Sequence, residues 1–279
     1  MLPVWLDGAL LDAGDARVLV SDHGITVGDG VFETLRTAPE PGGDRWVPFA
    51  VTRHLRRLRR SLEGLGLDLE RSDGELRAAM HDVAGHIEGP GRIRLTVTGG
   101  PGPLGSARAD VPLTVFVAGS EIDGWPETGA SVTVPWVRNE RSAVAGLKTT
   151  SYAENVVALV RAREQGASEA LFANTAGQLC EGTGSNVFVV LDGRLSTPPL
   201  STGCLAGVTR ELVCELIEVA EDELPVSVLA EVDEVFLTSS TRDVQGQHQI
   251  DDRTLDAPGP ITTEAARAFA DLVARDIDP

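Results

Sequence analysis

The first half of the chain contains short stretches in which apolar and polar residues alternate, and this period of two is typical of half-buried strands. Along residues 31–36, one face carries Val31, Glu33 and Leu35. The other face carries Phe32, Thr34 and Arg36. The turn pair Asp7-Gly8 separates two such stretches and favours a hairpin. We therefore predict strands over residues 2–6, 9–11, 31–36, 93–98 and 113–118.

A helical period replaces this alternation at residues 53–65. Leu55, Leu58, Leu62 and Leu65 recur at helical spacing, and most of the remaining positions are arginine. The basic side of this predicted helix is either a solvated face or the source of one arginine that reaches an anionic small molecule.

Residues 99–108 follow no period and are rich in glycine and proline. A loop of this composition and length often forms a lid over a site. Residues 121–130 are polar with further glycine and proline, so we place an interdomain connection there. This divides the chain into residues 1–120 and 131–279, with no internal repeat.

The second domain mixes both periods. A capping-box pattern at residues 151–154 predicts the start of a helix that ends at Gly166. Further helices are predicted over residues 208–220 and 263–276, and strands over residues 131–137, 169–174, 187–191 and 235–238. The fold class is therefore α+β.

Composition narrows the class of protein. The chain has 279 residues and a formal net charge of −18, which argues against nucleic acid and anionic membranes as partners. Its first twenty residues lack a basic segment, and no apolar run is long enough to cross a membrane, so we expect a cytoplasmic protein. The three cysteines are an odd number without metal-type spacing, which predicts free thiols and no metal site.

Lys148 is the single lysine among 24 basic residues. Arginine can replace lysine in a surface ion pair, but its guanidinium cannot form an imine. Amine chemistry is therefore one reason to keep a lysine here, and chance survival of a surface lysine is the other.

Three further segments suit a phosphorylated aldehyde cofactor. Glu181 lies in a glycine-flanked segment, predicted to be a loop between strands, where its carboxylate can face a ring nitrogen. At Gly207 a helix begins, so the N–H groups of Val208 and Thr209 can bind phosphate. Ser240 and Thr241 add hydroxyl groups at the end of a predicted strand. An exposed glutamate, a routine helix start and a plain turn are the alternatives.

The order of four features resembles the class IV aminotransferases. These features are the lysine ahead of a helix, then the segments EGTGSNVF, LAGVTRE and FLTSST. These are the fold-type IV pyridoxal-phosphate enzymes. SDHGITVGDGVFETLR and RHLRRL also resemble N-terminal segments of that family, so the resemblance covers nearly the whole chain. It implies a small N-terminal α/β domain, a larger C-terminal domain with a β-barrel-like core, and a homodimer.

The resemblance also implies roles for individual residues. Lys148 is the Schiff-base lysine, and Glu181 partners the pyridine nitrogen of pyridoxal 5'-phosphate. Tyr152, the single tyrosine, is a candidate for the cofactor's phenolic oxygen, or it is a packed residue at the first helical turn. The expected phosphate ligands are Arg57, Gly207, Val208, Thr209, Ser240 and Thr241.

Within the family the sequence favours a transaminase that moves an amino group from a D-amino acid or related primary amine to a 2-oxo acid through a Lys148 aldimine. The alternative is an aminodeoxychorismate lyase that releases pyruvate and 4-aminobenzoate. Branched-chain transaminases usually run longer, and nothing in the sequence indicates their substrate pocket. A non-catalytic relative that binds a ligand would have no reason to keep both Lys148 and Glu181.

The substrate carboxylate lacks an obvious partner. D-amino acid transaminases carry an Arg-x-His pair after the strand that ends here at Thr98, and this chain has Gly99-Gly100-Pro101 there. The candidates that could replace the pair are drawn from elsewhere in the chain: His23, Phe32, Arg36, Arg108 and Arg242.

Overall fold

The computed structural model describes residues 2–279, and the chain divides into two compact units. The first unit contains residues up to 124 together with residues 147–151 and 272–279, and the second contains residues 125–146 and 152–271. The segment around Lys148 thus lies with the first unit, although it is far along the chain.

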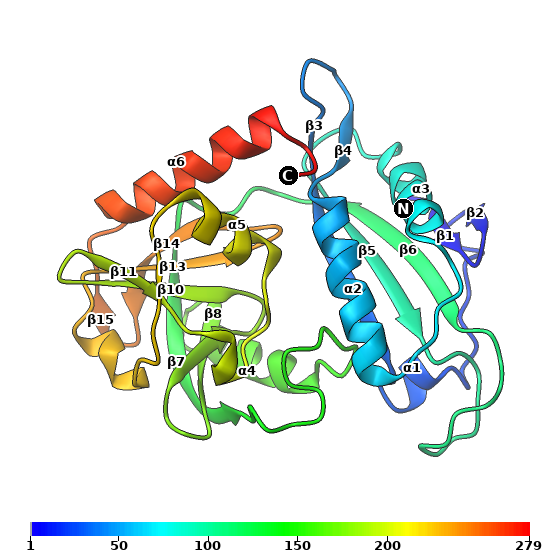
Figure 1. The fold of residues 1–279 in the computed structure, drawn as a ribbon, viewed down its shortest axis with the longest axis horizontal. Coiled ribbons are helices and arrows are strands. Elements are labelled where there is room, and N and C mark those ends of the chain that lie inside the picture. Colours follow the sequence, from blue (N-terminus) through cyan, green and yellow to red (C-terminus); the bar gives the residue numbers. More distant parts are fainter. Residues whose placement is uncertain (1) are drawn as a thin grey trace. The chain divides into compact units, whose positions relative to one another are not determined.

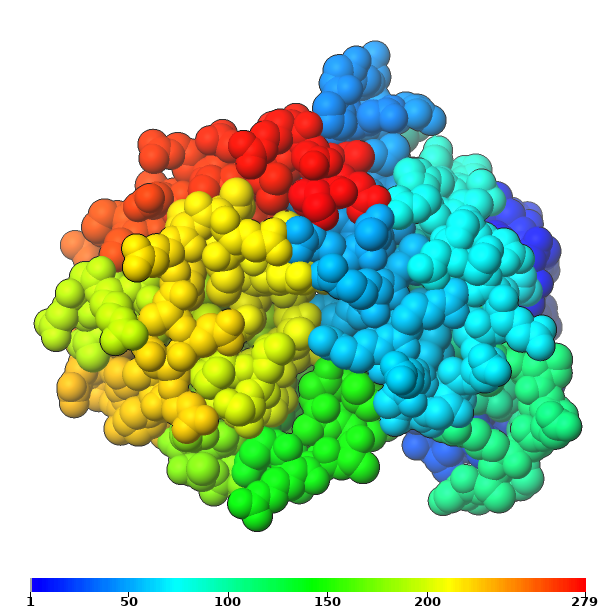
Figure 2. Space-filling model, in the orientation of Figure 1, coloured from blue at the N-terminus to red at the C-terminus, as the bar shows by residue number. Residues whose placement is uncertain are grey.

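The first unit is built on a six-stranded antiparallel sheet with the order β2-β1-β6-β5-β3-β4. Its strands are β1 (Val4–Leu6), β2 (Ala9–Leu11), β3 (Gly30–Pro39), β4 (Trp46–Pro48), β5 (Gly91–Thr98) and β6 (Thr114–Glu121). Its helices are α1 (His23–Thr26), α2 (Val51–Leu65) and α3 (Asp73–Ala84). Figure 1 shows α2 and α3 beside the sheet, and the β3–β4 hairpin projects from the surface in Figure 2.

The core of this unit follows from the predicted periods. Val31 and Leu35 of β3 are fully buried against Leu55, Leu58 and other apolar residues of α2. The predicted strand over residues 31–36 and the predicted helix over 53–65 are therefore confirmed. Helix α3 was not predicted, although Ser72 and Glu75 form a complete capping box at its start.

The second unit is built on a nine-stranded mixed sheet with the order β12-β11-β10-β13-β14-β7-β8-β9, and β15 pairs with β14. Its strands are β7 (Thr128–Arg138), β8 (Glu169–Asn174), β9 (Leu179–Gly182), β10 (Asn186–Leu191), β11 (Arg194–Thr197), β12 (Ala220–Glu221), β13 (Glu234–Ser239), β14 (Asp243–Ile250) and β15 (Arg253–Thr254). Its helices are α4 (Ala153–Glu164), α5 (Val208–Leu216) and most of α6 (Pro260–Arg275), with the short 3-10 turns Leu200–Thr202 and Val226–Ala230.

Three predictions in this unit were wrong in detail. The capping box at residues 151–154 does not form: Tyr152 is the N-cap residue of α4 and makes no side-chain cap bond, because the Ser151 hydroxyl instead donates to Gly28 O at 3.0 Å. Helix α5 ends at Leu216, because Ile217 has an extended backbone. Glu181 lies on β9 rather than in a loop.

The three cysteines are free thiols, as predicted. Within residues 2–279, no helix is both long enough and apolar enough to cross a membrane. No cluster of His, Cys, Asp and Glu side chains suited to a metal ion occurs among these residues either.

Candidate active site

The backbone of Lys148 is held between β3 and α2. Its carbonyl accepts the N–H of Phe32 at 3.0 Å, and its own N–H donates to the Ser61 hydroxyl at 3.2 Å. Val31 and Thr149 form an antiparallel bridge beside this pair. These contacts fix the direction in which the lysine side chain leaves the backbone.

The amine of Lys148 lies 4.5 Å from the centre of the Phe32 ring. The guanidinium of Arg94, which is on β5, lies 3.6 Å from the centre of the same ring. Phe32 is buried, whereas Arg94 is exposed. Arg94 lies in the predicted strand over residues 93–98, but the sequence gives it no role, because only the pairing of β3 with β5 brings it to Phe32.

A buried ionic cluster adjoins this amine. Glu33 accepts hydrogen bonds from Arg57 Nε at 2.8 Å and Arg57 Nη2 at 2.6 Å, and from His54 Nδ1 at 2.7 Å. Burial alone would raise the pKa of Glu33, but the charge and hydrogen bonds of Arg57 and His54 outweigh it and hold the pKa at about 2. Burial lowers the pKa of His54. The hydrogen bond and charge of Glu33 oppose this shift, whereas the positive charges of Arg57 and Lys148 add to it.

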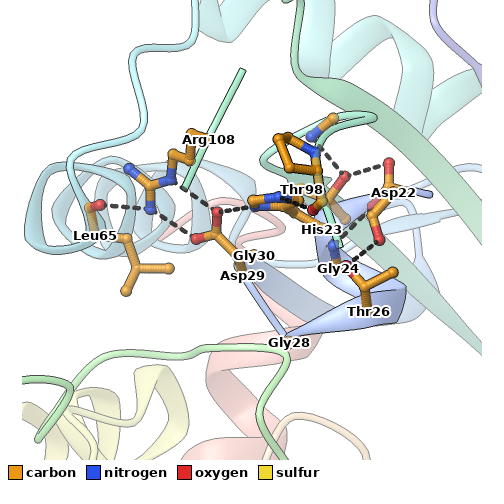
Figure 3. Close-up of polar contacts among 12 residues, drawn as sticks. Asp22, His23, Gly24, Thr26, Gly28, Asp29, Gly30, Leu65, Thr98 and Arg108 are labelled. Atoms are coloured by element: carbon orange, nitrogen blue, oxygen red, sulfur yellow. Dashed lines mark hydrogen bonds and ion pairs between the residues drawn. The ribbon is translucent and has the colours of Figure 1, made fainter. Parts of the chain in front are cut away.

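Figure 3 shows what the candidate Arg108 contacts. Its guanidinium donates to Asp29 Oδ2 at 2.7 Å and Oδ1 at 2.6 Å, and to the carbonyls of Gly66 and Leu65 at 3.0 and 2.9 Å. These bonds lower the pKa of Asp29 and raise that of Arg108. Arg108 therefore fastens the loop over residues 99–108 to the end of α2.

His23 belongs to the same cluster. Its Nε2 donates to the carbonyl of Pro103 at 3.0 Å, and its Nδ1 lies 3.4 Å from Asp29 Oδ2. The ring is almost fully buried. Arg36, another candidate, is half-buried and donates through Nε to Thr37 O at 3.3 Å.

In the second unit, Arg138 and the backbone of Leu205 hold Glu181. Its Oε1 accepts Arg138 Nε at 3.1 Å, and its Oε2 accepts the N–H of Leu205 at 2.9 Å. Arg138 also donates to Glu154 Oε2 at 2.6 Å. Sequence reasoning missed Arg138, because an arginine at the end of a strand carries no signal of its own.

The start of α5 provides backbone donors. Gly207 is its N-cap residue, so no side chain caps this helix, and a Cβ atom there would overlap Asn186 Oδ1. The buried residues Val208 and Thr209 form the first turn, whose N–H groups favour an anion. The Ser240 and Thr241 turn follows β13 in the same unit.

Arg242 follows this turn, and its guanidinium contacts Glu169 and Trp125. Its Nη2 lies 3.3 Å from Glu169 Oε2, and its guanidinium stacks 4.1 Å from the Trp125 ring centre. Burial lowers the pKa of Arg242, and Glu169 opposes that shift. Among the described residues its Nη1 has no hydrogen-bond partner.

The comparisons with known proteins agree on a family. The model described as "Amino-transferase class IV" matches residues 30–250, more than half of the chain. The chain belongs to this family. A putative branched-chain-amino-acid aminotransferase of Methanocaldococcus jannaschii is 31% identical over 97% of this chain and 96% of its own length. The D-alanine aminotransferase of Bacillus licheniformis is 27% identical over 98% and 97%.

Solved structures of the family agree with this assignment. The branched-chain aminotransferase of Thermoproteus uzoniensis superposes with a TM-score of 0.91 at 29% identity, covering 99% of this chain and 97% of that one. A branched-chain amino acid aminotransferase of T.th., solved with N-(5'-phosphopyridoxyl)-L-glutamate, covers 98% of this chain and 94% of its own at 25% identity and a TM-score of 0.89. The chain is a class IV, pyridoxal-phosphate-dependent transaminase. Its fold-type IV, α+β class is as predicted, and the fold has two curled half-barrel sheets.

The residues of this structure fit that cofactor. They supply an amine at Lys148, a carboxylate at Glu181 held by its neighbours, a buried guanidinium at Arg57 and an uncapped helix start at Gly207. These are the donor types that an aldehyde, a pyridine nitrogen and a phosphate require.

Proposed function

We propose that this transaminase exchanges the amino group between a branched-chain or similar aliphatic L-amino acid and a 2-oxo acid. The observation that carries the proposal is the likeness, over almost the full length of both chains, to enzymes with branched-chain names. The loop over residues 99–108 also has no histidine, so the Arg-x-His pair of D-amino acid transaminases is missing from it.

The proposed roles of the residues follow from their donors. When bound, pyridoxal phosphate accepts the electron pair released at the substrate α-carbon. Lys148 anchors the cofactor and moves the α-proton, and Glu181 keeps the pyridine nitrogen protonated. Arg57 holds the phosphate, and Tyr152 contacts the phenolic oxygen. Further phosphate contacts come from the start of α5 and the turn after β13, at Gly207, Val208, Thr209, Ser240 and Thr241.

Phe32 has a separate proposed role. Its buried ring lies under the Lys148 amine and keeps water from one side of it.

D-amino acid transamination is a second candidate, favoured by the D-alanine aminotransferase among the relatives. The lyase alternative is not retained, because every relative reported above has a transaminase name.

A half-reaction tests the proposal. The holoenzyme is mixed with L-leucine, L-isoleucine, D-alanine or D-glutamate without acceptor, and the cofactor absorbance is followed. Conversion to the pyridoxamine form by the aliphatic L-amino acids alone is expected. Conversion by D-amino acids alone would instead establish the second candidate. Borohydride reduction and peptide mapping of the same sample should place the label on Lys148.

Arg94 is proposed as a carboxylate partner of the substrate. It is an exposed guanidinium on the ring that the Lys148 amine also contacts. We expect Arg94→Gln to raise KM for amino acids by about tenfold or more and to leave KM for primary amines without a carboxylate unchanged. The neighbouring exposed Arg92→Gln is the matched control. An equal rise for both substrate types would remove Arg94 from this role.

A further inference from the structure

Glu33 is a carboxylate placed in an apolar core. It lies between Val31 and Leu35 on the face of β3 that packs on α2, and it is 1% exposed. A buried ion pair can often be replaced by apolar residues without loss of stability, because desolvation offsets the attraction. Stability therefore gives no sufficient reason for Glu33.

Its geometry restricts Arg57 to one orientation. The two carboxylate oxygens accept from Nε and Nη2 of Arg57, which together form a planar bidentate pair. His54, one turn before Arg57 on α2, donates to Oε2 and holds the carboxylate from a third direction. All three side chains are at most 6% exposed, so neither partner can be exchanged for water at the surface.

The cluster lies close to the reactive amine. Ser61, which accepts the N–H of Lys148, is one helical turn after Arg57. Phe32, whose ring contacts the Lys148 amine, directly precedes Glu33 on β3. A cofactor bound to Lys148 that carries a phosphate would therefore place this phosphate near Arg57, whose guanidinium plane Glu33 already fixes.

We propose that Glu33 and His54 are positioning residues that fix the Arg57 guanidinium for the cofactor phosphate. This rests on the proposed function, in which Arg57 binds that phosphate. Glu33 contributes no phosphate contact itself; its role is to keep Arg57 from rearranging when the phosphate binds.

The test compares two aldehydes on the apoenzyme, pyridoxal phosphate and pyridoxal, which differ only in the phosphate. For Glu33→Gln we expect the dissociation constant of pyridoxal phosphate to rise on the order of tenfold, because an amide cannot accept both guanidinium donors. The dissociation constant of pyridoxal should stay as in the wild type. If the net positive charge mattered more than orientation, the variant would instead bind pyridoxal phosphate more tightly, and the proposal would be overturned.

Two controls separate positioning from a fold defect. Glu63→Gln makes the same chemical change at an exposed position of α2 and should alter neither constant. His54→Asn keeps a donor near the position of Nδ1, whereas His54→Ala removes it. Weaker pyridoxal-phosphate binding in His54→Ala, restored in His54→Asn, is expected even where Glu33→Gln does not fold.

Other outcomes are equally decisive. If Glu33 and His54 had a purely structural role, their variants would weaken the binding of both aldehydes, and this result would contradict the proposal. A wild-type protein that binds neither aldehyde would contradict the assignment of Lys148 and Arg57 instead, so the two failures can be distinguished.

Discussion

At the scale of single residues, the structure shows that individual arginines hold different protein groups. Arg108 donates hydrogen bonds to Asp29, and Arg138 donates hydrogen bonds to Glu181 and Glu154. With 23 arginines in the chain, residue type alone could not distinguish these roles. Lys148 was predictable for the opposite reason, because it is the single lysine. Glu33 could also have been found, since a charge between Val31 and Leu35 interrupts an apolar face.

Glu181 offers the clearest residue-scale prediction. Its oxygens accept from Arg138 and from the backbone of Leu205, so Glu181→Gln would turn an amide N–H₂ toward one of these donors. The amide also cannot keep a pyridine nitrogen protonated. We expect the cofactor to bind and kcat to fall by about 100-fold. Turnover within about threefold of wild type, with the exposed Glu164→Gln as control, would show that Glu181 does not face the ring.

At the scale of elements, the local sequence pattern was sufficient to predict a helix or strand that buries one regular face. It failed where contacts with residues distant in the sequence determine the local structure. β14 was missed because Gln245 and Gln247 are polar yet buried, with their amides bonded inside the unit. Ser151 was assigned to a cap because its alternative partner, Gly28 O, is 123 residues away. No local pattern could show either arrangement.

The start of α2 is another element set by distant residues. Its N-cap residue, Ala50, has no capping side chain and a left-handed backbone with φ of 56°. Asp278 supplies the cap instead: its Oδ1 accepts the N–H of Thr52 at 2.7 Å, and its Oδ2 accepts Arg77 Nη1 of α3 at 2.9 Å. The tail after α6 therefore stabilises the helix that carries His54 and Arg57.

We expect Asp278→Ala to lower the free energy of unfolding by about 1 kcal/mol, the usual cost of a lost N-cap. Burial raises the pKa of Asp278, but its bonds to Thr52 and Arg77 lower it further, to below the ordinary 3.8. A lowered carboxyl pKa stabilises the fold above the unfolded value and loses that contribution as the pH falls below it. Denaturant titration should thus show the difference at pH 7 and a smaller one below about pH 3.8. Asp271→Ala, an exposed charge on α6, is the control; an equal loss there would contradict the cap.

At the scale of the whole molecule, the family pattern predicts a homodimer, and we propose that the surface around α1 takes part. Several large apolar side chains there are exposed to water, among them Leu19 at 63%, Val20 at 86% and Ile25 at 61%. A group of exposed apolar side chains is unfavourable in a monomer and typical of an interface. Leu104, at 80%, lies in the loop that His23 holds through the carbonyl of Pro103. Such a surface is stabilised when a second copy removes it from water.

Sedimentation of the wild type should therefore give twice the chain mass of 29.5 kDa at micromolar concentration. Val20→Asp should shift the protein toward monomer, because a charge would be buried without a partner. Val156→Asp is the matched control, because Val156 is 59% exposed on α4 in the other unit. A wild type that stays monomeric and active would contradict the dimer. A Val20→Asp protein whose dimer dissociation constant equals that of the wild type would place the interface on another surface, since burying an unpaired charge costs several kcal/mol.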